Sequence, residues 1–393
     1  MPDHSEASNR NRLLIVQPYI PSYRVPFFST VRKLLAAEGI QVAVAGSQAS
    51  GSDAARKDDL TVSSADFILP QKKWSMGSQS ILLRSLGQTM SSFQPGLVVV
   101  EQAIKNLEAL PLLLRPGAMR SPSVAMWGQG RSYSTRQNAV AGHLKQVLTR
   151  RADWFFSYTN RGADYVVAHG FPSDRVTVLC NTTDTAALQA SIDAVSAEEL
   201  DSFRAAYDLA QGYTGLFLGG LDERKGVNFL LKSVREIYDE VPKFRLLVGG
   251  SGEMENVVQR EAASGGPVRY LGRVEGRDKA LAFAAADFLM IPEWVGLVAV
   301  DSLAAGKPLV STHHDSHSPE FEYLVEGETL ALSEHEPSGY ARAIVKLMRD
   351  PERLNHMSYR GRLSTKDLSI EKMADNFVTG VLAWQSSLRL REF

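Results

Sequence analysis

The feature that most constrains the fold of this chain is an alternation of short apolar runs with longer amphipathic segments. This order predicts an α/β fold, because parallel strands need helical crossovers and are apolar on both faces. The expected strands form two series. The first series is 13–17, 42–46, 97–101, 124–128, 154–159 and 176–181, and the second is 215–220, 244–250, 268–274, 287–292 and 307–312.

The two series predict two doubly wound, parallel-sheet domains. A chain of 393 residues exceeds what one hydrophobic core usually supports. Residues 182–213 hold no expected strand, and SAEE at 196–199 has the pattern of a capping box at a helix start. We therefore expect a disordered tail at 1–12, an N-terminal domain at 13–190, a C-terminal domain at 191–368 and a final helix within 369–393.

Composition excludes several classes of protein. The formal net charge of −1 gives no overall attraction to nucleic acid. The single cysteine, Cys180, excludes an internal disulfide and fits a reducing compartment. No apolar run approaches the ~18–20 residues that a membrane span needs, and the polar residues 1–12 do not form a secretory signal. We expect a cytoplasmic protein.

The segment 291–310 carries the clearest chemical signal. Its two acids, Glu293 and Asp301, surround a helix that we expect to begin near Gly296 and to end at Gly306. A carboxylate accepts hydrogen bonds from adjacent sugar hydroxyls, and the amides of a helix start attract phosphate. The amides in question belong to Gly296, Leu297 and Val298. The pattern indicates a nucleotide-sugar site, although a loop acid and a helix-face acid without a ligand would have the same spacing.

This arrangement resembles the E-x7-E signature of retaining glycosyltransferases of family 4. Seven residues separate Glu293 from Asp301, and the second acid of the signature is Asp here, which keeps the charge with a shorter reach. The resemblance implies the GT-B fold, with two Rossmann-like domains, an interdomain cleft and a final helix that returns to the first domain. It also implies that Glu293 contacts the transferred sugar and that Asp301 contacts the ribose.

Further elements of the second half resemble the donor site of the same family. GGLDERKG at 219–226 resembles its phosphate-binding turn, and Lys225 would neutralise a diphosphate there. Gly220 stands where the family usually has Arg, and Arg224 is the candidate substitute. LGRV at 271–274 resembles the loop whose main chain reads the base. This resemblance assigns to the nucleotide Gly272, Arg273 and Val274.

A cluster of histidines and acids follows the last expected strand. It consists of His313, His314, Asp315, His317 and Glu320. Imidazole and carboxylate are common metal ligands, so a metal site is one interpretation. The resemblance favours the other, in which this loop borders the donor pocket and a histidine hydrogen-bonds phosphate or sugar. Because the chain has no Asp-x-Asp motif for a metal–diphosphate complex, we expect no required metal and no cofactor.

The first half is expected to bind the acceptor. Tyr19, Tyr23 and Arg24 follow the first strand as exposed candidates for stacking on a sugar and pairing with an anionic group, unless they form only a rigid turn. WGQG at 127–130 resembles a family element that normally carries a histidine. Gln129 replaces it and cannot act as a general base. A retaining mechanism tolerates this change, because the departing phosphate can accept the proton of the acceptor.

Positive charge is concentrated in the segment 105–151. The segment contains eight basic residues and one acid, Glu108, so its net charge is +7. They are Lys105, Arg115, Arg120, Arg131, Arg136, Lys145, Arg150 and Arg151. Within this segment, 143–154 interleaves basic and apolar residues. That pattern fits a helix lying on an anionic membrane, and it also fits an ordinary solvated or packed helix face.

The resemblance implies a retaining glycosyltransferase whose catalytic residues are Glu293, Lys225 and Gln129. Its donor would be a nucleotide diphosphate sugar, with a UDP-sugar favoured, and its acceptor a glycan or lipid-linked molecule of polysaccharide or glycoconjugate assembly. Two alternatives stay open. One is another GT-B enzyme, such as a nucleotide-sugar epimerase or a phosphorylase. The other is a non-catalytic protein that binds a nucleotide sugar, to which Gly220 and Gln129 point.

Overall fold

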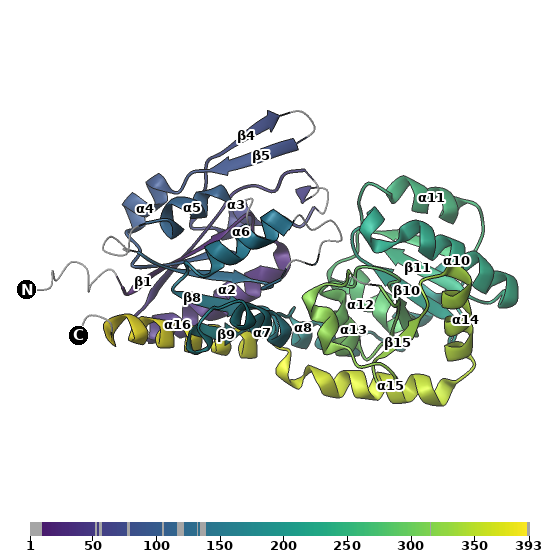
Figure 1. Ribbon diagram of the computed structural model, residues 1–393. Coiled ribbons are helices and arrows are strands. Elements are labelled where there is room, and N and C mark those ends of the chain that lie inside the picture. The colour runs from purple at the N-terminus through teal and green to yellow at the C-terminus, as the bar shows by residue number, and fades with distance from the viewer. Residues whose placement is uncertain are drawn as a thin grey trace, which may run out of the picture. The chain divides into compact units, whose positions relative to one another are not determined.

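The computed structural model divides the chain into two compact units, each built around its own parallel sheet (Figure 1). The structure describes residues 10–51, 53–54, 57–76, 79–103, 106–115, 122–131, 133, 139–314 and 316–390. Residues 1–9 of the expected tail lie outside this part of the chain. The N-terminal unit comprises Met1–Ala54, Asp58–Asn181 and Ile370–Phe393, and the C-terminal unit comprises Ala55–Lys57 and Thr182–Ser369.

The sheet of the N-terminal unit has seven strands in the order β3-β2-β1-β6-β7-β8-β9. All of its pairings are parallel. The strands are β1 (Arg12–Gln17), β2 (Gln41–Gly46), β3 (Phe67–Ile68), β6 (Leu97–Glu101), β7 (Ser123–Gly128), β8 (Trp154–Ser157) and β9 (Val176–Val178). The strand order reverses between β1 and β6. In sheets of this kind, ligands bind at such switch points, beyond the carboxyl ends of the strands.

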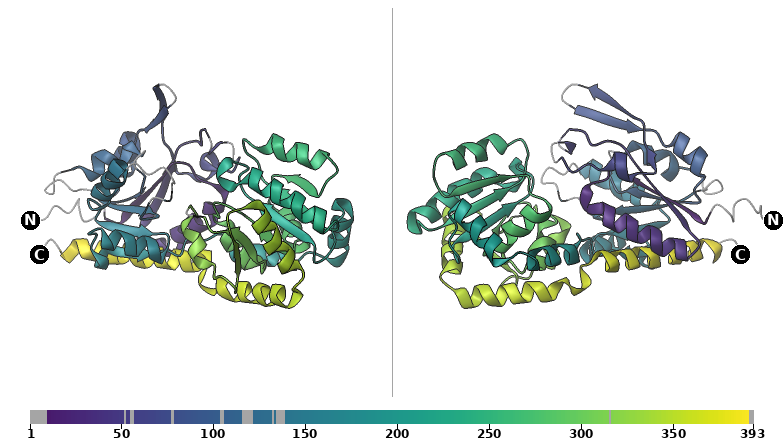
Figure 2. Two further views of the ribbon diagram at one scale, coloured as in Figure 1. Left: turned by 45° about the vertical axis from the view of Figure 1, so that its right-hand side comes forward. Right: turned by 180° about the vertical axis from the view of Figure 1, so that it is seen from behind.

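Helices cover both faces of this sheet, because alternate side chains of each strand point to opposite faces. Leu13 and Ile15 of β1 contribute to one core and Leu14 and Val16 to the other. The first core is closed by α2 (Val25–Ala37) and α16 (Ile370–Leu390), which lie side by side (Figure 2). On the other face pack α4 (Gly87–Phe93), α5 (Leu110–Leu113), α6 (Ala139–Thr149) and α7 (Asn160–Ala168).

Two features of the N-terminal unit were not expected from the sequence, strand β3 and a hairpin. β4 (Gln71–Met76) and β5 (Gln79–Arg84) form an antiparallel hairpin. β4 begins with the polar run Gln-Lys-Lys, so it lacks the apolar character by which strands of a two-sided parallel sheet are recognised. The remaining short helices of this unit are η1 (Ser22–Arg24), α3 (Thr61–Ser64), η3 (Leu107–Ala109) and η5 (Ser173–Arg175).

The C-terminal unit has a six-stranded parallel sheet in the order β12-β11-β10-β13-β14-β15. Its strands are β10 (Thr214–Leu218), β11 (Arg245–Gly249), β12 (Val268–Gly272), β13 (Phe288–Met290), β14 (Leu309–Thr312) and β15 (Leu330–Ser333). The switch point lies between β10 and β13. Main helices are α10 (Val227–Glu240), α11 (Glu255–Ala263), α12 (Gly276–Ala285), α13 (Val298–Ala305), α14 (Pro337–Met348) and α15 (Pro351–Ser364). The prediction of two parallel-sheet α/β units is confirmed, and β15 is an additional strand.

The division between the units falls at Asn181–Thr182, whereas the sequence placed the boundary at 190–191. The difference arises because α8 (Thr185–Asp193) packs against α12 and α13 of the C-terminal unit. The next helix, α9 (Ala197–Tyr207), also packs against α12. It begins with the expected capping box, in which Ser196 and Glu199 each accept the other's main-chain N–H.

Candidate functional site

The two loops that flank the switch point of the C-terminal sheet converge on one place. The loop after β10 leads into η6 (Glu223–Lys225), and the loop after β13 leads into α13. Lys225 is 8% exposed, and its Nζ donates a hydrogen bond to the main-chain oxygen of Trp294 at 2.7 Å. A Cβ atom at Gly296 would lie 3.5 Å from the same Nζ. The ammonium group therefore lies beside the start of α13.

The start of α13 has no side-chain cap. The helix begins at Val298, with Leu297 as its N-cap, so it starts two positions after the expected Gly296. A leucine side chain cannot accept the N–H groups of the first turn. Those of Ala299 and Val300 donate to the main-chain oxygens of Gly296 and Leu297, so the amides to consider for an anion are those of Gly296, Leu297 and Val298. The helix ends at Gly306, which has the expected left-handed conformation with φ +61°. Gly296, Leu297 and Val298, the three residues assigned to phosphate from the sequence, thus line an uncapped helix start next to an ammonium group.

Glu293 lies against the glycine that follows Lys225. Gly226 has φ +67°, and a Cβ atom there would lie only 2.8 Å from Cδ of Glu293. Both the left-handed backbone and the close approach require glycine at this position. The structure therefore brings Lys225, Gly226 and Glu293 together at the carboxyl end of the sheet, as the sequence predicted for Lys225 and Glu293.

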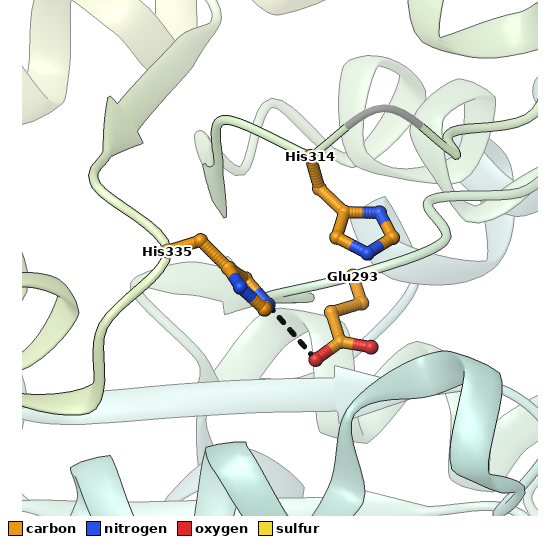
Figure 3. Close-up of side chains that lie close together, drawn as sticks. All are labelled: Glu293, His314 and His335. Atoms are coloured by element: carbon orange, nitrogen blue, oxygen red, sulfur yellow. Dashed lines mark hydrogen bonds and ion pairs between the residues drawn. The ribbon is translucent and has the colours of Figure 1, made fainter. Parts of the chain in front are cut away.

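Glu293 has a partner that the sequence analysis did not identify. His335, which follows β15, donates a hydrogen bond from Nε2 to Oε1 of Glu293 at 3.0 Å (Figure 3). The ring of His335 stacks on Phe229 of α10, with 5.0 Å between centroids and 13° between planes. This residue was missed because β15 itself was missed. A histidine just after a strand of the parallel sheet would have been the signal.

Asp301 is held by two residues of the C-terminal unit. It lies on α13 and is 8% exposed. Its Oδ2 accepts a hydrogen bond from Nζ of Lys279 at 2.8 Å, and its Oδ1 accepts one from Oγ1 of Thr183 at 2.9 Å. Neither partner was identified from the sequence. A ribose hydroxyl that binds Asp301 must compete with them.

The glycine turns of the C-terminal unit are explained by close main-chain contacts. A Cβ atom at Gly250 would lie 1.9 Å from the main-chain oxygen of Gly219. Gly272, at the end of β12, has φ +69°. Next to it, Arg273 forms an ion pair with Glu275. The turns therefore have a structural role whether or not a nucleotide contacts them.

The other residues assigned to the nucleotide lie near the same loops. Val274 packs against Gly249, where an added Cβ atom would approach Cγ2 of Val274 to 2.7 Å. The guanidinium of Arg224 pairs with Asp222 at 3.1 Å and lies 5.4 Å from the centroid of the Trp294 ring. Gly220 leaves space on its own side, because the nearest atom to an added Cβ would be Oδ2 of Asp222 at 3.5 Å.

The histidine cluster predicted after β14 does not come together as one ligand set. Burial lowers the pKa of His317 to about 4, and its Nδ1 accepts the main-chain N–H of Val295 at 3.3 Å. This ring is therefore a neutral structural group, stacked on Phe321 with 3.9 Å between centroids. Asp315 lies outside the described residues. Within the described part of the chain, the side chains that could share a metal ion are Glu293, His314 and His335.

In the N-terminal unit, Arg24 is buried instead of exposed, which corrects the prediction. It is 4% exposed, and its guanidinium lies 4.9 Å from the Trp127 ring centroid and 5.6 Å from that of Tyr158. Tyr23 also contacts it, at 5.1 Å, and is partly buried, while Tyr19 is buried. Cation–π contacts with three rings stabilise this buried charge. The prediction that Arg24 is exposed was wrong because the rings of Trp127 and Tyr158, which bury it, are distant in the sequence.

Gln129 lies in a turn whose next residue, Gly130, is held in place by Gly162 and Gln102. Gly130 has φ +72°, and an added Cβ atom would lie 2.3 Å from the main-chain oxygen of Gly162. The buried side chain of Gln102 accepts the N–H of Gly130 at 3.0 Å and donates to its oxygen at 3.1 Å. Gln129 itself is partly exposed at the carboxyl end of β7.

The basic segment 105–151 is described only in part, because Lys105, Arg120 and Arg136 lie outside the described residues. On α6, Val140 is 74% exposed and Leu144 is 44% exposed. Lys145, a basic residue of the same helix, donates a hydrogen bond to the main-chain oxygen of Arg131 at 3.1 Å. Burial lowers the pKa of Lys145 to about 8. No described helix combines the length and the apolar character needed to cross a bilayer.

One protein family matches the second half of the chain, and curated proteins match about a third of the chain. Residues 212–350 match the family described as "Glycosyl transferases group 1". A phosphatidyl-myo-inositol mannosyltransferase of Mycobacterium tuberculosis is 34% identical over 127 residues, 30% of this chain and 34% of the relative. A D-inositol 3-phosphate glycosyltransferase of Corynebacterium jeikeium is 30% identical over 151 residues, 35% of each chain. The chain thus spans about a third of the length of these curated relatives.

Solved structures resemble this chain over nearly its whole length. A glycosyltransferase of Rickettsia africae has a TM-score of 0.68 at 13% identity, covering 95% of this chain and 99% of that one. Alr3699/HepE of Anabaena, in complex with UDP and glucose, has a TM-score of 0.68 at 15% identity with the same coverage. A UDP-GlcNAc 2-epimerase of Neisseria meningitidis has a TM-score of 0.61 at 16% identity, covering 94% and 99%. At these identities the likeness establishes the fold alone.

Proposed function

We propose that the chain is a retaining glycosyltransferase, starting from the match of residues 212–350 to the family described as "Glycosyl transferases group 1". In this proposal a nucleotide diphosphate sugar binds the C-terminal unit and its sugar is transferred to a hydroxyl of an acceptor. The observation that carries the proposal is the convergence of Lys225, Gly226 and Glu293 at the switch point of the matched unit. Parallel α/β sheets bind their ligands at this position.

Each group has a role that follows from its charge. The ammonium of Lys225 and the uncapped start of α13 neutralise the diphosphate, because both offer positive charge to an anion. Glu293 accepts hydrogen bonds from hydroxyls of the transferred sugar. Asp301 binds the ribose in exchange for one of its present partners, Lys279 or Thr183. The nucleotide base contacts the main chain near Gly272.

The proposed reaction needs no general base from the protein. The bond between the anomeric carbon and the phosphate oxygen breaks, and the acceptor oxygen bonds to that carbon on the same face. The acceptor proton passes to the departing phosphate oxygen, which yields a glycoside and a nucleoside diphosphate. The protein positions the reactants and stabilises the charge of the leaving group, mainly through Lys225. Gln129 orients a hydroxyl, and no metal or other cofactor is required.

The acceptor in this proposal is a glycan or a lipid-linked molecule that the N-terminal unit binds. Names of two relatives support a lipid or phosphorylated acceptor, since one is a phosphatidyl-myo-inositol mannosyltransferase and another a D-inositol 3-phosphate glycosyltransferase. Tyr23 and Gln129, both partly exposed, are the proposed contacts. A protein acting on such acceptors would work in the cytoplasm at the membrane surface. Val140 and Leu144 of α6 would enter the lipid interface, with Arg150 close to anionic headgroups.

The donor can be identified by thermal shift with UDP, GDP, dTDP and ADP, because a ligand that binds only the folded state stabilises it. The structure of HepE, which this chain resembles in fold, is a complex with UDP, and a further relative is described as GDP-mannose-dependent. These two nucleotides are therefore the first to compare. The corresponding nucleotide sugars are then incubated with the protein, with and without glycan and lipid acceptors, and nucleoside diphosphate release is measured.

The decisive variant is Glu293→Gln, which removes the charge and keeps the shape of the side chain. We expect it to lose turnover while nucleotide affinity, measured by thermal shift, stays within about twofold. Glu334→Gln is the matched control, because Glu334 is an exposed acid on the loop that carries His335. Undiminished turnover in Glu293→Gln would contradict the role of Glu293. Sugar conversion without an acceptor would favour an epimerase, and nucleotide binding without any turnover would favour a non-catalytic protein.

A further inference from the structure

Three side chains from three neighbouring strands converge near the switch point. Glu293 follows β13, His314 follows β14 and His335 follows β15, and these strands are adjacent in the sheet. Their nearest ligand atoms all lie within 4.8 Å of one another. Figure 3 shows both imidazole rings directed toward the carboxylate of Glu293. The juxtaposition of two imidazoles and one carboxylate is produced by the parallel order of the strands.

We propose that Glu293, His314 and His335 bind a divalent transition-metal ion of the zinc type. Two histidines and one carboxylate form a donor set that suits this ion, and three protein ligands leave a fourth position for water. Neighbouring ligand atoms of a tetrahedral zinc site lie roughly 3.3 Å apart, as follows from bonds of about 2.0–2.1 Å. The separation of 3.0 Å between Nε2 of His335 and Oε1 of Glu293 is close to this value. Because all three ligand atoms lie within 4.8 Å of one another, no pair needs to approach by more than about 1.5 Å.

The His335 ligand is already oriented for this purpose. Its ring is held against Phe229 by parallel stacking, and its centroid lies 5.1 Å from that of His314. A metal ion would replace the proton that Nε2 of His335 now shares with Glu293, and that proton would move to Nδ1. Stacking on Phe229 uses the face of the ring and ligation uses its edge, so the ring can ligate without being turned.

His314 needs one local change. Its Nδ1 accepts the main-chain N–H of Ser316 at 3.3 Å, so the neutral ring carries its proton on Nε2. Ligation through Nε2 moves the proton to Nδ1 and breaks the contact with Ser316. At 3.3 Å this hydrogen bond is long, and losing it costs little compared with a bond to a metal ion.

The metal ion would act as an inhibitor, and this part of the inference rests on the proposed function. Glu293 cannot ligate the ion and accept hydrogen bonds from the donor sugar with the same oxygens. Zinc would therefore compete with productive donor binding and leave the diphosphate contacts of Lys225 in place. The expected effect is a loss of turnover that exceeds the loss of nucleotide affinity.

Metal binding is tested first, without reference to turnover. The full chain is freed of metal by chelation and dialysis, and Co2+ is titrated while its visible absorption is followed, because Zn2+ has a filled d shell. Zn2+ is then added to displace Co2+. We expect one ion per chain and at least about tenfold weaker binding in His314→Ala and His335→Ala. His313→Ala is the matched control, since His313 is an exposed histidine of the same loop that is not a member of the set.

Thermal unfolding of each variant is measured as a control, so that weaker metal binding is not assigned to a loss of folding. Absence of stoichiometric binding, or equal weakening in His313→Ala, would overturn the proposal. In the second measurement, Zn2+ is expected to inhibit turnover of the parent and of His313→Ala but not of His314→Ala. If no nucleotide sugar is turned over, the proposed function fails while the Co2+ result still decides the metal site. If His314→Ala is inhibited as strongly as the parent, inhibition through this site is wrong.

Discussion

The contact between Gly226 and Glu293 gives the sharpest test of the site, through the variant Gly226→Ala. Two effects of the added methyl group can be separated. The residue has φ +67°, and the left-handed conformation costs an L residue with a side chain about 1–2 kcal/mol. The methyl carbon would also lie 2.8 Å from Cδ and 2.9 Å from Oε1 of Glu293, well inside the ~3.5–4.0 Å of a normal contact.

The second effect displaces Glu293 without a large cost in stability. The colliding atoms are at the end of a flexible side chain, which can rotate away by about 1 Å. A misplacement of this size lowers turnover about 10²-fold when the displaced group contacts the reacting substrate. The unfolding free energy should fall by only the 1–2 kcal/mol of the backbone term, which is about 2–8 °C in Tm for a unit of this size.

Gly265→Ala is the matched control. Gly265 has φ +78° in the same unit, and an added Cβ atom there would have nothing within 4 Å. The two variants should therefore lose similar stability in thermal unfolding, and only Gly226→Ala should lose turnover in the nucleoside diphosphate release assay. Equal turnover in both variants would refute the role given to Glu293. A much larger drop in Tm for Gly226→Ala would refute the view that the side chain of Glu293 yields to the methyl group.

Three other outcomes follow from groups in the two units. His317 has a pKa of about 4 against 6.5 in the unfolded chain, so the unfolded state binds more protons between these values. The unfolding free energy should fall by up to about 3 kcal/mol from pH 6.5 to 4, and urea titrations of His317→Gln should lack this loss. Arg84→Met should destabilise the N-terminal unit by about 3–5 kcal/mol, because it leaves the buried Glu108 without its ion partner at 3.1 Å. The double variant Arg84→Met with Glu108→Leu should recover most of this lost stability. Lys279→Met should cost about 1 kcal/mol in the same titrations without weakening nucleotide binding, because it frees Asp301; weaker binding would contradict the exchange proposed for Asp301.

The alternation of apolar and amphipathic segments predicted both sheets, because parallel strands buried on two faces leave apolar runs that are hard to mistake. β15 escaped notice since LALS is short and lies between polar segments. The hairpin of β4 and β5 escaped because it does not belong to either parallel sheet. Local rules also worked at helix ends, where Ser196 and Gly306 act through neighbours a few residues away. The sequence thus predicted best what depends on short-range contacts or on repeated burial.

The same distinction, between what repeated burial predicts and what distant contacts decide, applies to the site residues. The proximity of Lys225 and Glu293 could be predicted because each follows a strand, and the parallel order of the sheet brings such positions together. Arg24 was taken as exposed, since an arginine near a turn usually is, and nothing nearby in sequence announces the rings of Trp127 and Tyr158. Contacts between distant residues set the burial of a charge, and one sequence does not contain them.

Both acids of the signature already have partners within the chain. Glu293 accepts from His335, and Asp301 accepts from Lys279 and Thr183. Partly buried carboxylates without such partners would be costly, so these contacts stabilise the site in the absence of sugar. In the proposed function, a sugar or ribose hydroxyl would exchange with an existing donor, and the net gain of each exchange would be small. Affinity for the nucleotide should therefore come mainly from the diphosphate at Lys225 and α13, while the acids select where the hydroxyls lie.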